Sequence, residues 1–367
     1  MIRRLWCGET MRILLLNFEK GWRGGERQTL LSLQQFRTAG HDVALLARRG
    51  AELARAALQE GIVVYEEDSV AGVCRVLWRQ RAAFDVYHAQ TAGMMTWLAV
   101  LKPILHGVTV FTRRTAFPVR RRPAITAWKW RRADVLVAIT QAAGAEPRRL
   151  GLQVHHVIPS AVEYRDADPE AIAAMRQQYR LNGGRRVIAT AAALTREKDP
   201  LTLIDAVHQL HQWRDDFVFL HFGAMGPMEA PARQRVQELG LQEHYIFAGF
   251  HANISDGYRL MDVFVLSSLE EALGSVVLDA FLYRVPVVST TAGGLAEVLA
   301  GGRGIGCSPG DSRCLAQGMQ RMLDDTASRD SMVDRAHDYV VHEHGVAHMA
   351  QCYLRAYAEA GAPAGGA

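Results

Sequence analysis

The chain has 367 residues, of which 49% are hydrophobic and 22% are charged. This composition is typical of a soluble globular protein, and the length favours two domains because single cores rarely grow past about 250–300 residues. No membrane-spanning helix is expected, since no run of about 18 uncharged apolar residues occurs.

The cysteines and the first ten residues indicate the compartment. The cysteines are scattered without the spacing of a metal site, at Cys7, Cys74, Cys307, Cys314 and Cys352. An odd number of cysteines without a secretory signal predicts reduced thiols and a cytoplasmic protein. Residues 1–10 lack the apolar core of a signal peptide, so we interpret them as an extension or a misplaced start.

Charge is divided unevenly along the chain. Residues 1–165 contain 25 Lys and Arg against 13 Asp and Glu, a net charge of +12, whereas residues 166–367 contain 17 against 25, a net charge of −8. A basic first half predicts an anionic partner, namely phosphorylated lipid, a membrane surface or nucleic acid. The alternative is a basic surface that is merely solvated.

The first half predicts a doubly wound parallel sheet. Its first strand, at 12–17, is apolar on both faces, and a loop with Gly24 and Gly25 connects it to a helix at 26–39. Glycines there let the backbone approach a phosphate or a sugar, although the Gly-x-Gly-x-x-Gly of dinucleotide sites is absent. Further strands are expected at 43–47, 62–65, 86–88, 108–112, 135–139 and 154–158. Because strands and helices alternate, the sheet should be parallel.

Arginines and aromatic residues are concentrated between positions 113 and 132. They are Arg113, Arg114, Phe117, Arg120, Arg121, Arg122, Trp128, Trp130, Arg131 and Arg132. Arginine paired with tryptophan suits a membrane interface. Nucleic-acid binding is the weaker alternative, because the sequence has no helix-turn-helix, zinc-finger or aromatic RNA-binding pattern. Arg113 and Arg114 follow a strand, so they are candidates for contact with an acceptor.

The second half is organised around residues 266–298. A strand at 263–266 leads to a turn with Glu271 and Gly274, then to a helix with apolar residues at the 3.6 period, and then to a strand at 285–289 before a Gly-Gly turn. Ligands of open α/β sheets bind at the strand C-termini, and helix N-termini favour anions. Glu271 and Asp279, eight positions apart, can therefore face one ligand from two sides of a bound anion.

This stretch resembles the signature of the retaining GT-B glycosyltransferases of group 1, also called GT4. That family has a Glu, seven residues and a second Glu, followed by an apolar strand and a Gly-Gly turn. Here Asp279 replaces the second Glu, so this carboxylate is one methylene shorter. The resemblance implies an α/β fold with two Rossmann-like domains facing across a cleft. Their limits are 11–165 for the acceptor-side domain, 166–340 for the nucleotide-sugar-binding domain and 341–358 for a helix that returns to the first domain. A turn is expected at 182–184 in the second domain, and the tail at 361–367, beyond these limits, is expected to be disordered.

The resemblance also implies roles for single residues. Glu271 would lie near the donor sugar, and Asp279 would accept hydrogen bonds from the ribose hydroxyls. Lys198 matches the lysine of the family, whereas Ala193 stands at the position of its arginine and Arg196 lies nearby. Lys198 and Arg196 would neutralise the diphosphate leaving group. Further donor contacts are expected at Gly24, Gly25, Phe250, His251, Gly274, Ser275 and Val276.

One motif of the first domain departs from the family pattern. The segment around His88 resembles the Asp-x-x-His-x-His of the family, but Gln90 stands where the second histidine is usual. In relatives that histidine contacts the donor sugar. A glutamine can hydrogen-bond a sugar hydroxyl but cannot act as a general acid, and we place Gln90 with Arg113 and Arg114 among the acceptor contacts.

We therefore expect a hexosyltransferase-type glycosyltransferase of the EC 2.4 class that transfers a sugar with retention. The acceptor would be an anionic glycolipid or glycan in lipopolysaccharide or other cell-surface polysaccharide biosynthesis, at the cytoplasmic face of the inner membrane, with no nucleic-acid partner. The sequence names neither base nor sugar, and a UDP-sugar is the expected co-substrate. No metal is expected, because no Asp-x-Asp is recognisable at a strand end and fixed cations with a helix N-terminus can stabilise a diphosphate.

Two alternatives remain open at this point. A GT-B sugar-nucleotide epimerase shares the fold and needs no acceptor. A non-catalytic nucleotide-sugar-binding subunit is kept open by the departures at Gln90, Ala193 and Asp279, although Glu271 and Lys198 are both present.

Overall fold

The computed structural model describes residues 10–181, 184–251 and 254–361. They divide into two compact units: unit 1 is the described part of Met1–Ala161 and Gly345–Ala367, and unit 2 is that of Val162–His344. The crossings at 161–162 and 344–345 lie within four residues of the limits predicted at 165–166 and 340–341. Residues 1–9 with Cys7, the first two residues of the expected turn at 182–184, and residues 362–367 of the tail lie outside the described residues.

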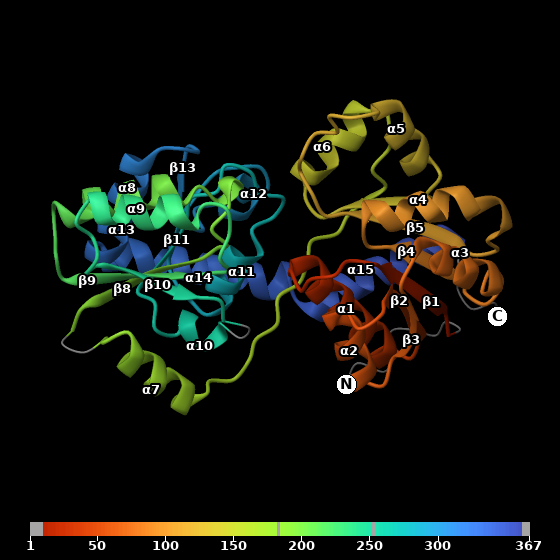
Figure 1. The fold of residues 1–367 in the computed structure, drawn as a ribbon, viewed down its shortest axis with the longest axis horizontal. Helices are drawn as coiled ribbons and strands as arrows, with labels where there is room; N and C mark the ends of the chain where they lie inside the picture. Colours follow the sequence, from red (N-terminus) through yellow and green to blue (C-terminus); the bar gives the residue numbers. More distant parts are fainter. Residues whose placement is uncertain (1–9, 182–183, 252–253, 362–367) are drawn as a thin grey trace. The chain divides into compact units, whose positions relative to one another are not determined.

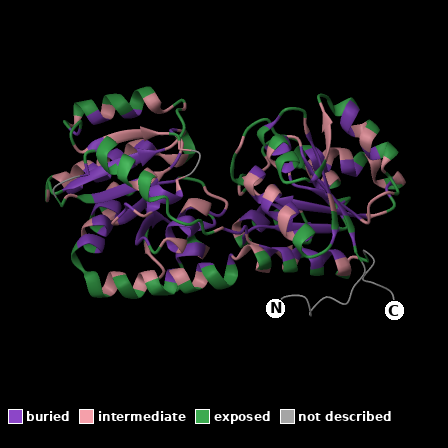
Figure 2. Cartoon of the chain, turned by 90° about the horizontal axis from the view of Figure 1, so that it is seen from below, coloured by how far each residue is buried: buried purple, intermediate pink, exposed green. Residues whose placement is uncertain are grey.

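The described strands of unit 1 form a seven-stranded parallel sheet in the order β3-β2-β1-β4-β5-β6-β7 (Figure 1). The strands are β1 (Arg12–Asn17), β2 (Asp42–Arg48), β3 (Val63–Glu67), β4 (Val86–Ala89), β5 (Val108–Arg113), β6 (Val135–Ala138) and β7 (His156–Val157). The helices are α1 (Gly24–Thr38), α2 (Glu52–Gln59), α3 (Val70–Arg79), α4 (Ala92–Leu101), the 3-10 helix η1 (Lys102–Ile104), α5 (Pro123–Arg131), α6 (Gln141–Arg149) and α15 (Val346–Glu359). The central strands of the unit 1 sheet are buried on both faces because helices cover both sides of the sheet (Figure 2).

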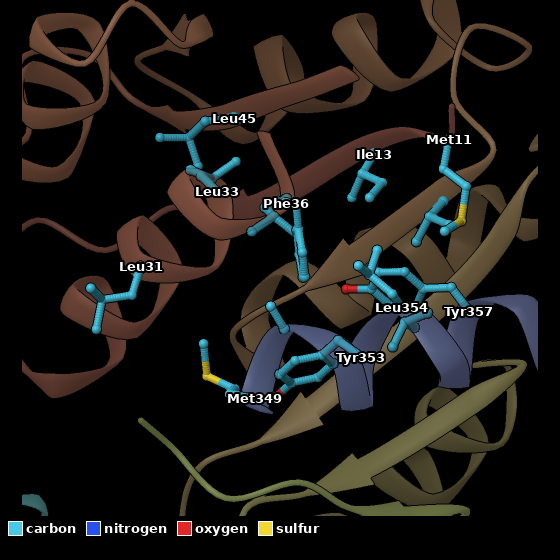
Figure 3. Packing of buried hydrophobic residues seen from close by; sticks show 14 of the residues in the cluster. Met11, Ile13, Leu31, Leu33, Phe36, Leu45, Met349, Tyr353, Leu354 and Tyr357 are labelled. Carbon is cyan, nitrogen blue, oxygen red and sulfur yellow. The ribbon is translucent and has the colours of Figure 1, made fainter. Parts of the chain in front are cut away.

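The C-terminal helix α15 completes the core of unit 1. Met349, Tyr353 and Tyr357 of this helix are buried with Phe36 of α1 and Ile13 of β1 (Figure 3). The ring of Tyr357 meets the ring of Phe36 edge-on, with centroids 5.8 Å apart. The folded core of unit 1 therefore needs residues from both ends of the chain.

The described strands of unit 2 form a six-stranded parallel sheet in the order β10-β9-β8-β11-β12-β13. The strands are β8 (Arg186–Ala191), β9 (Phe217–Phe222), β10 (Tyr245–Gly249), β11 (Val263–Leu266), β12 (Val287–Thr290) and β13 (Ile305–Cys307). The helices are α7 (Pro169–Gln178), the 3-10 helix η2 (Arg196–Lys198), α8 (Pro200–His211), α9 (Glu229–Glu238), α10 (Ser255–Tyr258), α11 (Ser275–Leu282), α12 (Leu295–Leu299), α13 (Ser312–Asp324) and α14 (Thr326–Glu343). Helices α8 and α13 bury one face of this sheet through Leu203, Val207, Leu315 and Met319.

The cysteines of unit 2 correct one sequence-based prediction. Cys307 at the end of β13 and Cys314 in the first turn of α13 form a disulfide, so the prediction of reduced thiols is wrong for this pair. The short connection between strand and helix brings the two Cα atoms to 5.7 Å, within the range that a disulfide spans. Cys74 and Cys352 are free.

No helix in residues 10–181, 184–251 or 254–361 combines the length and the apolar character that a membrane-crossing segment needs.

Candidate active site

The loops at one edge of the unit 2 sheet carry most of the predicted site residues. Because β8, β11 and β12 are adjacent and parallel, their carboxyl ends meet at the same edge. η2 with Arg196 and Lys198 follows β8, the loop with Glu271 follows β11, and the Gly293-Gly294 turn follows β12. The sheet order thus brings together residues that are far apart in the sequence.

Lys198 and Glu271 form an ion pair at this edge. The Lys198 Nζ donates to Glu271 Oε2, although the residues are 73 positions apart, and both side chains are mostly buried. Their two loops are also joined through the backbone, since the amide of Leu269 donates to the Glu197 carbonyl at 2.8 Å. The hydroxyl of Ser267 donates to the Lys198 carbonyl at 2.8 Å. A fixed cation and a fixed carboxylate therefore stand side by side before any ligand binds.

Two glycines let the neighbouring turns pack against Glu271. Gly293 has a φ of +54°, and a Cβ at this position would collide with the carbonyl of Glu271. The amide of Gly294 donates to the same carbonyl at 3.0 Å. Gly274, the N-cap of α11, has a φ of +82° and lies against the side chain of Leu295. Only glycine fits both positions without strain, and Gly293 is the first residue of the Gly-Gly turn of the signature.

Helix α11 begins directly after this turn. Its first residues, Ser275 and Val276, are partly exposed, and Gly274 gives the helix no side-chain cap. The amides of a first helical turn lack partners within the helix, and they suit an anion. Asp279 lies one turn further along and is 7% exposed. Glu271 thus lies in the loop that leads into α11, and Asp279 lies within that helix.

The remaining donor-site predictions lie on other loops of unit 2. Arg196 is exposed on η2, and Phe250 after β10 is 64% exposed. The Nε2 of His251 lies 2.9 Å from the hydroxyl of Tyr179, a contact across 72 positions that no local pattern indicates. Tyr179 and Ser267 are therefore residues of this region that sequence reasoning missed. Positions 252 and 253 are outside the described residues.

The two arginines predicted to contact an acceptor, Arg113 and Arg114, differ in their burial in unit 1. The Nε of Arg113 donates to the Thr115 carbonyl at 2.7 Å, another nitrogen donates to the Phe117 carbonyl, and the guanidinium lies over the Trp130 ring. Arg113 is 3% exposed, and burial lowers its pKa to about 10. Arg113 therefore orders its own loop, and only Arg114 of the two arginines is partly exposed. This corrects the expectation that both face a ligand.

Gln90 is also engaged within unit 1. It is 3% exposed, and its Oε1 accepts a hydrogen bond of 2.6 Å from Arg114. Its Nε2 lies 3.1 Å from Nδ1 of His88, whose ring nitrogens also contact Tyr357 and Thr112. Burial, together with the charge of Arg114, lowers the pKa of His88 well below its usual value, so this imidazole is neutral at pH 7.

The predicted glycine loop lies beside Arg114. Gly24 and Gly25 are the first residues of α1. A Cβ on Gly25 would contact the Cδ of Arg114 at an ordinary 3.8 Å. Glu26, in the same turn, uses its carboxylate for the Arg23 amide and Asn17.

Within the part of the chain that the structure describes, no three His, Cys, Asp or Glu side chains are grouped so that they could hold a metal ion. Independence of metals stays a prediction.

Comparison with known proteins decides the family. The model of the family described as "Glycosyl transferases group 1" matches residues 171–339, which include the region just described. The 2-deoxystreptamine glucosyltransferase of Streptomyces kanamyceticus is 30% identical over 276 residues, covering 74% of this chain and 68% of that protein. The chain belongs to the group 1 glycosyl transferases. The lipopolysaccharide core biosynthesis mannosyltransferase LpsB of Rhizobium meliloti is 28% identical to this group 1 glycosyl transferase over 152 residues, 40% of this chain and 43% of LpsB.

Solved structures show the fold of this group 1 glycosyl transferase. The crystal structure of Anabaena Alr3699/HepE in complex with UDP and glucose superposes with a TM-score of 0.84 at 20% identity, covering 95% of this chain and 100% of that one. The fold is thus GT-B, with two Rossmann-like units.

Proposed function

We propose that this group 1 glycosyl transferase moves a hexose, with retention, from a nucleotide sugar bound by unit 2 to a glycan or lipid-linked acceptor bound by unit 1. The observation that carries the proposal is the Lys198–Glu271 pair beside the N-terminus of α11. A departing nucleoside diphosphate needs its charge stabilised, and preorganised donors supply this without reorganisation. Lys198, Arg196 and the first amides of α11 would take that part.

The proposed reaction exchanges one bond at the anomeric carbon for another. The bond from this carbon to the diphosphate oxygen breaks, and a bond to the acceptor oxygen forms on the same face. The acceptor proton passes to the leaving diphosphate. Glu271 would position the sugar and stabilise the positive charge that develops on its ring, while Asp279 would hold the ribose hydroxyls.

Named relatives support the substrate classes. HepE has been crystallised with UDP-glucose, which makes a UDP-sugar our proposed donor. LpsB is a lipopolysaccharide core biosynthesis mannosyltransferase, and a second similar protein, LpsE of Rhizobium meliloti, is a lipopolysaccharide core biosynthesis glycosyltransferase. We therefore propose a role in cell-surface polysaccharide biosynthesis, with the protein acting in the cytoplasm.

A donor screen tests the proposed function. Purified protein is given UDP-, GDP- and ADP-sugars, and the release of the nucleoside diphosphate is measured alongside the thermal shift that each donor causes. We expect release from one donor and much slower release after Glu271→Ala. Conversion of the donor to its epimer without release would favour the epimerase, and donor binding without any turnover would favour a non-catalytic subunit.

Metal dependence gives a separate prediction. Because fixed cations and helix amides are proposed to stabilise the diphosphate, turnover should be unchanged in excess EDTA. The assay is nucleotide release before and after chelation. Loss of turnover that added magnesium restores would contradict a metal-free leaving-group site.

We also propose that unit 1 associates with the anionic surface of the inner membrane. The surface that we assign to this contact, the basic face, consists of the exposed residues Phe117, Arg120, Arg121, Arg122, Ile125, Trp128, Arg131 and Arg132. Trp128 is 42% exposed, whereas Trp130 is 4% exposed under Arg113 and is not part of this face. No acidic residue occurs between positions 86 and 133, so the charge of the face is complementary to anionic lipid.

Liposome binding checks this association. Replacing Arg120, Arg121 and Arg122 with Ser should weaken binding to anionic liposomes several-fold or more, because each basic residue near such a surface contributes about 1 kcal/mol. The matched control replaces Arg55, Arg75 and Arg79, which are exposed on α2 and α3, with Ser. Equal binding of wild type to anionic and neutral liposomes would remove the membrane proposal.

A further inference from the structure

Arg114 is a partly buried cation whose hydrogen-bond partners among the described residues are all neutral. One terminal nitrogen donates to the Ser160 hydroxyl at 3.2 Å, and the other donates to Gln90 Oε1 at 2.6 Å. Its Nε is buried and has no partner within the described part of the chain. Withdrawing a guanidinium from water is costly unless an opposite charge compensates it. Nothing that the structure describes around Arg114 supplies that charge.

Two carboxylates of unit 1, one next to Gly25 on α1 and one on α6, are engaged with other partners. Glu26 accepts from the Arg23 amide at 2.9 Å and from Asn17. Glu146 accepts from the Val119 amide at 2.8 Å and pairs with Arg149. Since Arg114 directly follows β5, it stands at the strand edge where parallel sheets bind their ligands.

Gln90 holds the guanidinium without cancelling its charge. Its side-chain amide is fixed because Nε2 lies against the ring of His88, which is itself held by Tyr357 and Thr112. A glutamate at this position would form an internal ion pair with Arg114. A glutamine supplies an accepting oxygen and leaves the positive charge for a ligand. Gln90, which replaces the usual histidine, thus accepts a hydrogen bond from Arg114 without neutralising it.

We propose that Arg114 binds an anionic group of the acceptor, a phosphate or a carboxylate, and that Gln90 is a positioning residue for Arg114 rather than a sugar contact. The guanidinium fork matches either anion in bidentate geometry. This inference rests on the proposed function, because it assigns the acceptor to unit 1. It narrows the acceptor class to molecules with a negative group near the accepting hydroxyl.

The test uses inorganic phosphate as the probe and the full chain saturated with UDP, so that the donor phosphate site is filled. Phosphate is titrated by calorimetry into wild type, Arg114→Gln, Gln90→Glu and the control Arg75→Gln, which removes an exposed charge from α3. We expect the first two variants to lose about tenfold or more in phosphate affinity and the control to match wild type. A parallel titration with acetate distinguishes a carboxylate from a phosphate as the preferred anion.

Phosphate binding that disappears when UDP is present would place the anion in the donor site and overturn the inference. Unchanged affinity in folded Gln90→Glu would overturn it as well, and this variant keeps the test valid if Arg114→Gln does not fold. Failure of the wild type to bind UDP would instead contradict the proposed function. Gln90→Ala should fall between wild type and Gln90→Glu, since it loses the positioning contact but keeps the free charge.

Discussion

The Lys198→Ala variant should lose about 10²–10³-fold in turnover, because a preorganised group that stabilises a departing charge contributes this much in rate. The expectation follows from the position of Lys198 on η2, beside Glu271 and at the strand edge of unit 2. Substrate binding should suffer less than turnover, since the charge on the leaving oxygen is largest in the transition state.

Single-turnover nucleotide release measures the effect. The control is Arg313→Ala, which removes an exposed cation from α13 and should behave as wild type. A double variant with Glu271→Ala should lose less than the product of the two single losses, because the two groups are in contact. Wild-type turnover in folded Lys198→Ala would refute the assignment. Lys198 is also the only lysine after position 129, so its protection from acetylation by bound UDP can be followed directly by mass spectrometry.

Removing each of the two signature carboxylates should affect a different step, UDP binding for one and turnover for the other. Asp279→Ala should weaken the binding of UDP by roughly 10–100-fold, since hydrogen bonds to a charged group contribute about 1.5–3 kcal/mol. Glu271→Ala should leave UDP affinity nearly unchanged and lower turnover instead, because we assign this residue to the sugar.

Titration calorimetry with UDP, paired with turnover of the UDP-sugar, separates the roles. Glu270→Ala is the matched control, because Glu270 is the exposed carboxylate next to Glu271 in the same loop. The reverse pattern, with UDP affinity lost in Glu271→Ala and retained in Asp279→Ala, would show that the two assignments are exchanged.

The strands were the most predictable part of the fold. β1 and β11 have the predicted bounds, because strands buried on both faces must be continuous apolar runs. β12 begins two residues later than predicted. Val285 donates its amide to the Ala280 carbonyl and so belongs to the end of α11, where Arg284 adopts a φ of +59°. A left-handed arginine at a helix end has no sequence signature comparable to that of glycine.

The sequence alone did not predict which of the two tryptophans near Arg113 is buried. Trp128 and Trp130 are two positions apart on α5, so they point to different faces of the helix. This spacing already indicates that they cannot both lie on one face of α5. The identity of the buried one depends on Phe111, whose ring centroid lies 5.7 Å from that of Trp130. That contact requires the packing of α5 on the sheet, which composition does not encode.

Only those residues of the candidate site that belong to a family motif could be predicted from the sequence. The family motif singled out Glu271 and Lys198, but the direct contact between these two side chains depends on β8 and β11 being neighbours in the sheet. The partner of His251 depends in the same way on the packing of α7. The disulfide was missed because a separation of seven residues across a strand and a helix is not a recognised cysteine pattern.

The route of the chain through the two units has a consequence for synthesis. A ribosome releases all of residues 162–344 before it releases α15, which carries Met349, Tyr353 and Tyr357 into the core of unit 1. Until then Phe36 lacks its aromatic neighbours and His88 lacks the Tyr357 hydroxyl. Domains usually fold in the order in which they are made. Here the contiguous unit 2 can close while unit 1 still waits for its last helix, so the unit that is translated first is the last to be finished.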